Sequence, residues 1–138
     1  MADPADEDPL LIVSDFDTLN ALSRALVEAK FHAEPIDPAV PGSALVADLA
    51  TRVADRVEQE TARRYPGIHG MVDGWRDPRE QPEMLAVVRR RLREIGGWQE
   101  WSEEEKRAQV RVLLAPLQPV DEVVRELVAW RDAPEAAD

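Results

Sequence analysis

Apolar residues recur at intervals of three and four along most of the chain, with charged residues between them. This period puts apolar side chains on one face of a helix and is the main sequence signal for amphipathic helices. The pattern predicts helices over about 14–32, 43–64, 78–95, 102–117 and 119–131. The positions expected to face the core are Phe16, Leu19, Leu22, Leu26 and Ala29; Leu45, Val46, Leu49, Ala50, Val53 and Val57; Met84, Leu85, Val88, Leu92 and Ile95; Val110, Leu113, Leu114 and Leu117; and Val120, Val123, Val124, Leu127 and Val128.

Capping residues support these limits. Ser43 precedes the second helix and Ser102 the fourth, and a serine side chain can accept a hydrogen bond from a free N–H of the first turn. Ser102 and Glu105 also match the capping box, in which each side chain bonds the backbone N–H of the other residue. Either Pro78 or Pro82 is expected to begin the third helix, because proline suits the first helical position.

These elements predict an all-α fold, a single-domain bundle of four to five helices, with a short extended segment as an option at the N-terminus. The bundle is expected to span residues 14–131. We expect the acidic residues 1–13 to be disordered or extended and residues 132–138 to form a disordered tail. Strand signals are nearly absent, which disfavours a nucleotide-binding α/β fold.

Composition and charge narrow the function classes. The chain of 138 residues contains no cysteine, which excludes disulfides, thiolate catalysis and thiolate metal sites. A net charge of −11 disfavours direct binding to nucleic acid and to anionic membranes. The acidic start is unlike a signal peptide and the apolar run after it is too short to cross a bilayer, so we expect a cytoplasmic location. The preference for arginine and alanine is associated with bacterial genomes rich in G and C.

The stretch LLIVSDFDTLNAL (10–22) resembles the first motif of the haloacid dehalogenase-like phosphotransferases, an apolar strand followed by Asp-x-Asp and a threonine. The resemblance implies that Asp15 attacks phosphorus, that Asp17 acts as acid/base, and that Mg²⁺ lies between them. The glycine usually found between the second aspartate and the threonine is missing, and no further strand follows. We therefore favour the other interpretation, in which Ser14, Asp15 or Asp17 caps a helix.

Residues 66–82 are rich in glycine and proline and have no sustained period. A loop of this length in a compact domain is often functional or mobile. His69, Asp73 and Asp77 form a candidate polar site there, because a histidine beside carboxylates can transfer protons or hold a metal. A local hydrogen bond is the favoured role for His69, and we expect neither a cofactor nor a metal.

Tryptophan is enriched at protein interfaces, since it buries a large area and carries one N–H that needs a partner. The predicted partner-binding residues are Trp75, Arg76, Trp98, Trp101 and Trp130. Among these, Trp98 is expected to be buried as a plug over the third and fourth helices. Trp75 and Trp101 are expected to be the exposed aromatic side chains.

The sequence therefore favours a small acidic bacterial module that binds another protein as an accessory, adaptor or regulatory subunit. A homodimer through the long second helix is one form of such binding. The first alternative is a small helical enzyme or ligand-binding protein that uses residues 66–82. The second is an acidic mimic of nucleic acid. The arginine-rich stretch 89–94 is interpreted as a solvated face with ion pairs rather than a phosphate-binding patch.

Overall fold

The computed structural model describes residues 9–67 and 73–134, and in these ranges it consists of helices and connectors without a strand. The α-helices are α1 (Phe16–Phe31), α2 (Ala44–Arg64), α4 (Pro82–Glu94), α5 (Glu103–Leu114) and α6 (Asp121–Asp132). Short 3-10 helices are η2 (Asp73–Arg76), η3 (Pro78–Glu80) and η4 (Trp98–Glu100). The all-α prediction is confirmed.

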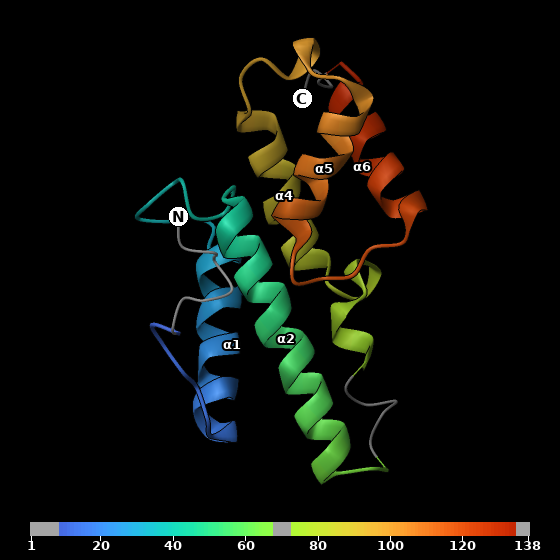
Figure 1. Ribbon diagram of the computed structural model, residues 1–138. Coiled ribbons are helices and arrows are strands. Elements are labelled where there is room, and N and C mark those ends of the chain that lie inside the picture. Colours follow the sequence, from blue (N-terminus) through green and yellow to red (C-terminus); the bar gives the residue numbers. More distant parts are fainter. Residues whose placement is uncertain (1–8, 68–72, 135–138) are drawn as a thin grey trace, which may run out of the picture.

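The helices form two groups that lie side by side (Figure 1). α1 and α2 make a helical hairpin, and α4, α5 and α6 pack on one another. α2 also contacts α5, and α1 contacts α4, so both helices of the hairpin touch the second group. The main core lies within the second group and consists of Val88, Leu92, Trp98, Val110, Leu113, Leu114, Leu117, Val123, Val124, Leu127 and Val128.

The observed helix limits follow the predicted capping residues. Ser43 Oγ accepts a hydrogen bond from the backbone N–H of Val46 at 3.2 Å, which begins α2. At the start of α5, Ser102 and Glu105 form both bonds of the capping box, at 3.1 and 3.3 Å. The third predicted helix divides at the two prolines, because Pro78 begins η3 and α4 begins at Pro82.

Arginines of the second helical group hold the C-terminal ends of other helices. The last carbonyl groups of a helix have no partner within the helix and attract positive charge. Arg91 Nη2 donates to the carbonyl oxygens of His32 and Ala33, both at 2.8 Å, just beyond α1. Arg131 Nε donates to the carbonyl of Leu92 at 2.7 Å near the end of α4. Arg91, from the arginine-rich stretch, therefore acts within the fold.

A buried lysine joins the hairpin to α5. Lys30 on α1 is 1% exposed, and its Nζ donates to the carbonyl oxygen of Val112. Pro116 has no N–H, so the carbonyl of Val112 lacks the donor that a continuing helix would supply four residues later. Lys30 takes the place of that donor. Desolvation by burial lowers the pKa of Lys30 to about 8.

The predicted core face of α2 is wrong at two leucines. Leu45 is 84% exposed and Leu49 is 42% exposed. α2 instead packs through Ala47, Ala50, Val53 and Ala54, all of which are buried. The neighbouring helices therefore meet a face of small residues that is rotated away from the leucines.

Val120 was also expected to face the core, and that prediction is wrong as well. It is 52% exposed because it is the N-cap of α6 and precedes the first helical turn.

Candidate protein-binding surfaces

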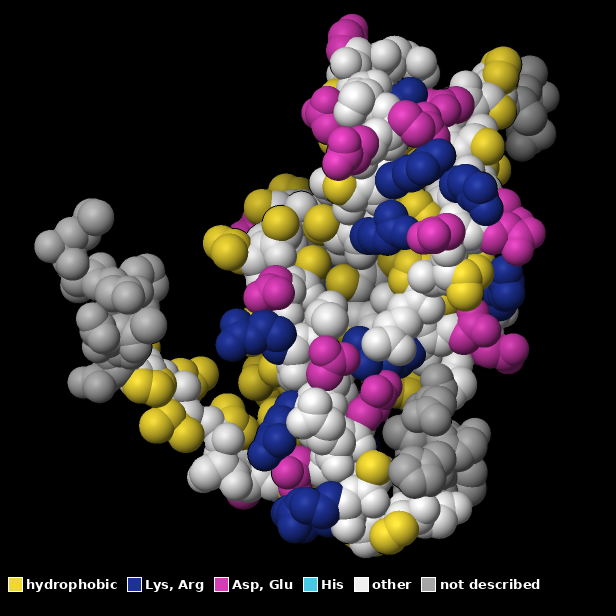
Figure 2. Space-filling view, turned by 45° about the vertical axis from the view of Figure 1, so that its right-hand side comes forward, with side chains coloured by type: hydrophobic (Ala, Val, Ile, Leu, Met, Phe, Trp, Pro, Cys, Tyr) yellow, Lys and Arg dark blue, Asp and Glu magenta, His cyan; other side chains and the backbone are white. Residues whose placement is uncertain are grey.

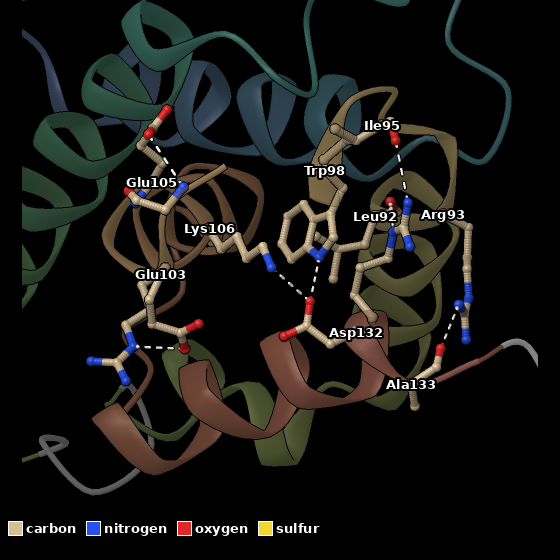
Figure 3. Close-up of polar contacts among 12 residues, drawn as sticks. Leu92, Arg93, Ile95, Trp98, Glu103, Glu105, Lys106, Asp132 and Ala133 are labelled. Carbon is tan, nitrogen blue, oxygen red and sulfur yellow. Dashed lines mark hydrogen bonds and ion pairs between the residues drawn. The ribbon is translucent and has the colours of Figure 1, made fainter. Parts of the chain in front are cut away.

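Trp98 and Trp101 lie at the corner between α4 and α5 and take different positions. Trp98 is 1% exposed, whereas Trp101 is half-buried, and their ring centroids are 5.5 Å apart. Trp98 Nε1 donates to Asp132 Oδ1 at 2.7 Å, and Lys106 Nζ donates to the same oxygen at 3.0 Å (Figure 3). Trp98 is therefore a buried plug, as expected, and is not available to a partner.

Two cations and one carboxylate surround Trp98. Lys106 Nζ lies 5.5 Å and Arg131 Cζ 5.4 Å from the centroid of the indole ring, distances typical of cation–π contacts. The pKa of Asp132 is lowered: desolvation by burial acts to raise it, but hydrogen bonds from Trp98 and Lys106 and the charges of Lys106 and Arg131 outweigh this effect. These contacts give Trp98, Lys106 and Asp132 a structural role within the fold.

Trp101 and Trp130 expose part of their rings. Both are half-buried against the core. Arg93 Cζ lies 4.2 Å from the ring centroid of Trp130, so a guanidinium covers one side of that ring. Each tryptophan leaves some apolar surface for a partner, and their predicted role in binding stays a prediction.

Arg76 is buried and ties α2 to the connector between α5 and α6. It is 1% exposed, and its Nη1 lies 2.8 Å from Asp55 Oδ1 and 3.1 Å from Glu58 Oε1. Its Nε donates to the carbonyl of Pro116 at 2.7 Å. Arg76 was predicted to contact a partner, but in this position its side chain has no surface to offer.

Trp75, the neighbour of Arg76, is half-buried and lines an open groove of about 390 Å³ between the hairpin and the start of α4. Its lining is mostly apolar, and polar side chains of α1 also take part. The lining residues are Asn20, Ser23, Arg24, Val27, Glu28, Val57, Trp75 and Met84. The volume and the mostly apolar lining of this groove are those of a small-molecule site.

The candidate polar site of the 66–82 loop is not assembled by the described residues. His69 lies outside them, and Asp73 begins η2 but its side chain also lies outside them. Asp77 is an N-cap, because its Oδ1 accepts a hydrogen bond from the backbone N–H of Arg79 at 3.0 Å. In the ranges 9–67 and 73–134, no group of three or more histidine and carboxylate side chains is placed to hold a metal ion.

Asp15 caps α1. Its Oδ2 accepts hydrogen bonds from the Thr18 hydroxyl at 2.7 Å and from the Thr18 backbone N–H at 2.9 Å. These two bonds, the side-chain bond first, lower the pKa of Asp15. Residues 9–14, ahead of it, form no strand, and Asp17 is exposed in the first turn of the helix. The strand expected from the phosphotransferase resemblance is wrong, and the capping interpretation is confirmed.

Two groups of exposed aliphatic side chains were not anticipated as binding surfaces. The first is Leu10, Leu11 and Ile12, which are 103%, 78% and 72% exposed; we call them the N-terminal apolar segment. The second is Leu45 and Leu49, the α2 leucine pair. Figure 2 shows hydrophobic side chains on the extended segment that leads to the N-terminus. Both groups are visible in the sequence as apolar residues, but apolar residues in such patterns are normally buried in the core.

In the C-terminal part of α2, three arginines surround one glutamate, while Asp55 and Glu58 lie against Arg76. Glu60 Oε2 accepts from Arg63 Nη2 at 2.7 Å, Glu60 Oε1 lies 3.1 Å from Arg56 Nη2, and Arg64 Nε lies 3.8 Å from Oε2. The hydrogen bond from Arg63 and the three guanidinium charges lower the pKa of Glu60 against the opposing effect of desolvation. One carboxylate thus faces three arginines, and we call this group the Glu60 cluster.

No family model, curated protein or solved structure matches this chain. None of the helices in the described ranges has the length and apolar character needed to cross a membrane.

Proposed function

We propose that this chain is a protein–protein interaction module without catalytic activity of its own, and that the α2 leucine pair is its principal contact. The observation that supports the proposal is the exposure of Leu45 and Leu49 on a helix that packs into its own fold through alanines. Leucines four residues apart lie on one side of a helix, which is how a helix presents itself to an apolar groove or to another helix.

Leu45 contributes little to folding, because its side chain remains largely in water, whereas Leu49 is 42% exposed and is partly covered by its own fold. Burying a leucine completely contributes about 1.5–3 kcal/mol. At an interface, covering the exposed part of both leucines would add apolar burial that the fold itself does not use. The half-buried Trp101 and Trp130 are secondary candidates, since less of their surface is free.

The test compares wild type with the double variant Leu45→Ser/Leu49→Ser and with the control Val120→Ser, which changes another exposed aliphatic residue. Each protein is used to capture its partner from a lysate of the cell that makes it, with cross-linking and quantitative mass spectrometry. We expect a partner that wild type and the control retain equally and that the double variant loses by about 10-fold or more. Circular dichroism checks that all three are folded. Equal capture by the double variant would contradict the proposal.

Ligand binding is the second candidate function, and the groove beside Trp75 favours it. A volume of about 390 Å³ with a mostly apolar lining falls in the range of small-molecule sites. An apolar fluorescent dye should bind there saturably and quench Trp75, and Met84→Arg, at the edge of the groove, should abolish both effects. Unsaturable binding, or binding that Met84→Arg leaves intact, would argue against this function.

Mimicry of nucleic acid is not proposed. A mimic needs carboxylates that are free to imitate phosphates, whereas acids along α2 are paired with arginines. Asp48 lies 3.6 Å from Arg52, and Glu60 faces three guanidinium groups.

A further inference from the structure

We infer that the occupant of the α2 leucine pair is the N-terminal apolar segment of a second copy of this chain. The inference rests on the proposed function and goes further by naming the partner. It starts from the presence of two unpartnered apolar features in the same chain. Leu10, Leu11 and Ile12 are almost entirely in solvent, and so is Leu45. Of these two features, only Leu49 is partly covered by its own fold, at 42% exposed.

Charge supplies the complementarity between them. In the sequence, Asp6, Glu7 and Asp8 directly precede the apolar segment. On α2, the leucine pair is followed by Arg52, which lies 3.6 Å from Asp48, and then by the Glu60 cluster, in which three arginines outnumber one carboxylate. Spacings of four and three residues place Leu45, Leu49, Arg52 and Arg56 on one side of the helix. Along the segment the acidic residues come first and the apolar residues second, whereas along α2 the leucines come first and the arginines second. The two patterns therefore match when the segment and the helix run antiparallel.

The lengths agree with this pairing. From the middle of the leucine pair to Glu60 the helix rises by about 20 Å. An extended segment would cover about 13 Å from the centre of Leu10–Ile12 to Glu7 and about 27 Å to Asp3. With the apolar residues on Leu45 and Leu49, the acidic residues therefore fall alongside the arginines.

The same segment does not match its own α2. Val13 and Asp15 line a hollow of about 270 Å³ together with Arg56, Arg63 and Arg64, so the segment leaves the fold at the basic part of α2. Leu10 is three residues from Val13, about 10 Å of extended chain, whereas the leucine pair lies about 20 Å along the helix from Glu60. Leu10–Ile12 therefore fall short of the leucine pair of their own chain, whereas a second copy can bring its leucine pair to them.

Because each copy has both features, two such contacts form in one closed pair. The segment of each copy covers the leucine pair of the other, related by a two-fold axis. The structure thus points to a dimer made by exchange of N-terminal segments.

The first experiment measures the molar mass of the full-length protein by size-exclusion chromatography with light scattering. Wild type is expected to be a dimer. The segment variant Leu10→Ser/Leu11→Ser/Ile12→Ser and the pair variant Leu45→Ser/Leu49→Ser should each weaken dimerisation by about 100-fold or more, because each removes one side of both contacts. Mixing the two variants should restore a weaker heterodimer, since one intact segment then meets one intact leucine pair. Val120→Ser should behave as wild type.

The second experiment uses the absence of cysteine from the chain. The double variant Leu11→Cys/Leu49→Cys contains the only two thiols, so mild oxidation reports which side chains meet. A covalent dimer on a non-reducing gel is expected if the segment is exchanged. A disulfide within one chain would show that the segment covers its own leucine pair and would overturn the inference.

The outcomes separate the inference from the proposed function. A monomeric wild type, or a dimer unaffected by the segment variant, overturns segment exchange. If the pair variant still loses a captured partner in that case, the proposed function stands and its partner is another protein. If the pair variant dimerises and captures as wild type does, both are overturned.

Discussion

Replacing Lys30 with methionine removes a buried charge and keeps an unbranched side chain that is one heavy atom shorter. Lys30 is 1% exposed, and burial lowers its pKa from 10.5 to about 8. An ammonium group with a lowered pKa is held in the folded state at a cost. The variant Lys30→Met removes this cost but leaves the carbonyl of Val112 without a donor, which costs about 1–3 kcal/mol. The two effects oppose each other near pH 7.

The pH dependence of stability separates the cost of the buried charge from the cost of the lost hydrogen bond. Because the pKa of Lys30 is lower in the folded state, the unfolded chain holds more protons between pH 8 and 10.5, and stability rises with pH in that window. The fall in pKa from 10.5 to about 8 corresponds to a cost of about 3 kcal/mol at pH 7. At pH 10 most of this cost has gone, since the folded lysine is then neutral. Wild type should therefore gain about 2–3 kcal/mol relative to the variant between pH 7 and pH 10.

The assay is urea unfolding followed by tryptophan fluorescence, with both proteins measured at each pH. Groups common to the two proteins, such as Tyr65, cancel in the difference. The chain contains only two lysines, Lys30 and Lys106, so NMR of lysine labelled at the carbon next to Nζ gives the pKa of Lys30 directly. A difference in stability that does not change with pH, together with a Lys30 pKa above 10, would refute the reasoning.

Further variants test other contacts by the same unfolding assay, each compared with wild type. Ser102→Ala should lose about 1 kcal/mol, because the first turn of α5 loses its cap; an unchanged midpoint would contradict the capping box. Arg76→Met should lose about 2–3 kcal/mol, since the carbonyl of Pro116 loses a charged donor. Asp132→Asn should destabilise at neutral pH. Since the pKa of Asp132 is lowered by folding, its contribution is present above pH 3.8 and is lost as the pH falls through the folded value, so wild type and variant should converge in acid. Trp98→Phe removes the indole N–H and should reduce the effect of Asp132→Asn in the double variant.

Local signals in the sequence predict the helices well, because these signals act within a few residues. Ser43 and Ser102 cap their helices by hydrogen bonds to residues three positions ahead, and Asp15 does the same for α1. For the same reason the capping interpretation of Asp15 could be preferred over a phosphotransferase motif. The residues of the candidate binding surfaces were harder to predict from the sequence. Trp98 was expected to be buried, but Arg76 gave no sign in the sequence that it would be buried against Asp55, Glu58 and Pro116.

The sequence by itself determined that the chain is helical and, through Ser43 and Ser102, where α2 and α5 begin, because capping and helical periodicity are short-range properties. Only the tertiary structure decided which face of α2 is buried. Leucines and alanines both recur at helical spacing on that helix, and either face satisfies the pattern. The neighbouring helices pack against the alanines and leave Leu45 and Leu49 in solvent. The exposed surface therefore depends on contacts between residues far apart in the chain, which periodicity along one helix does not report.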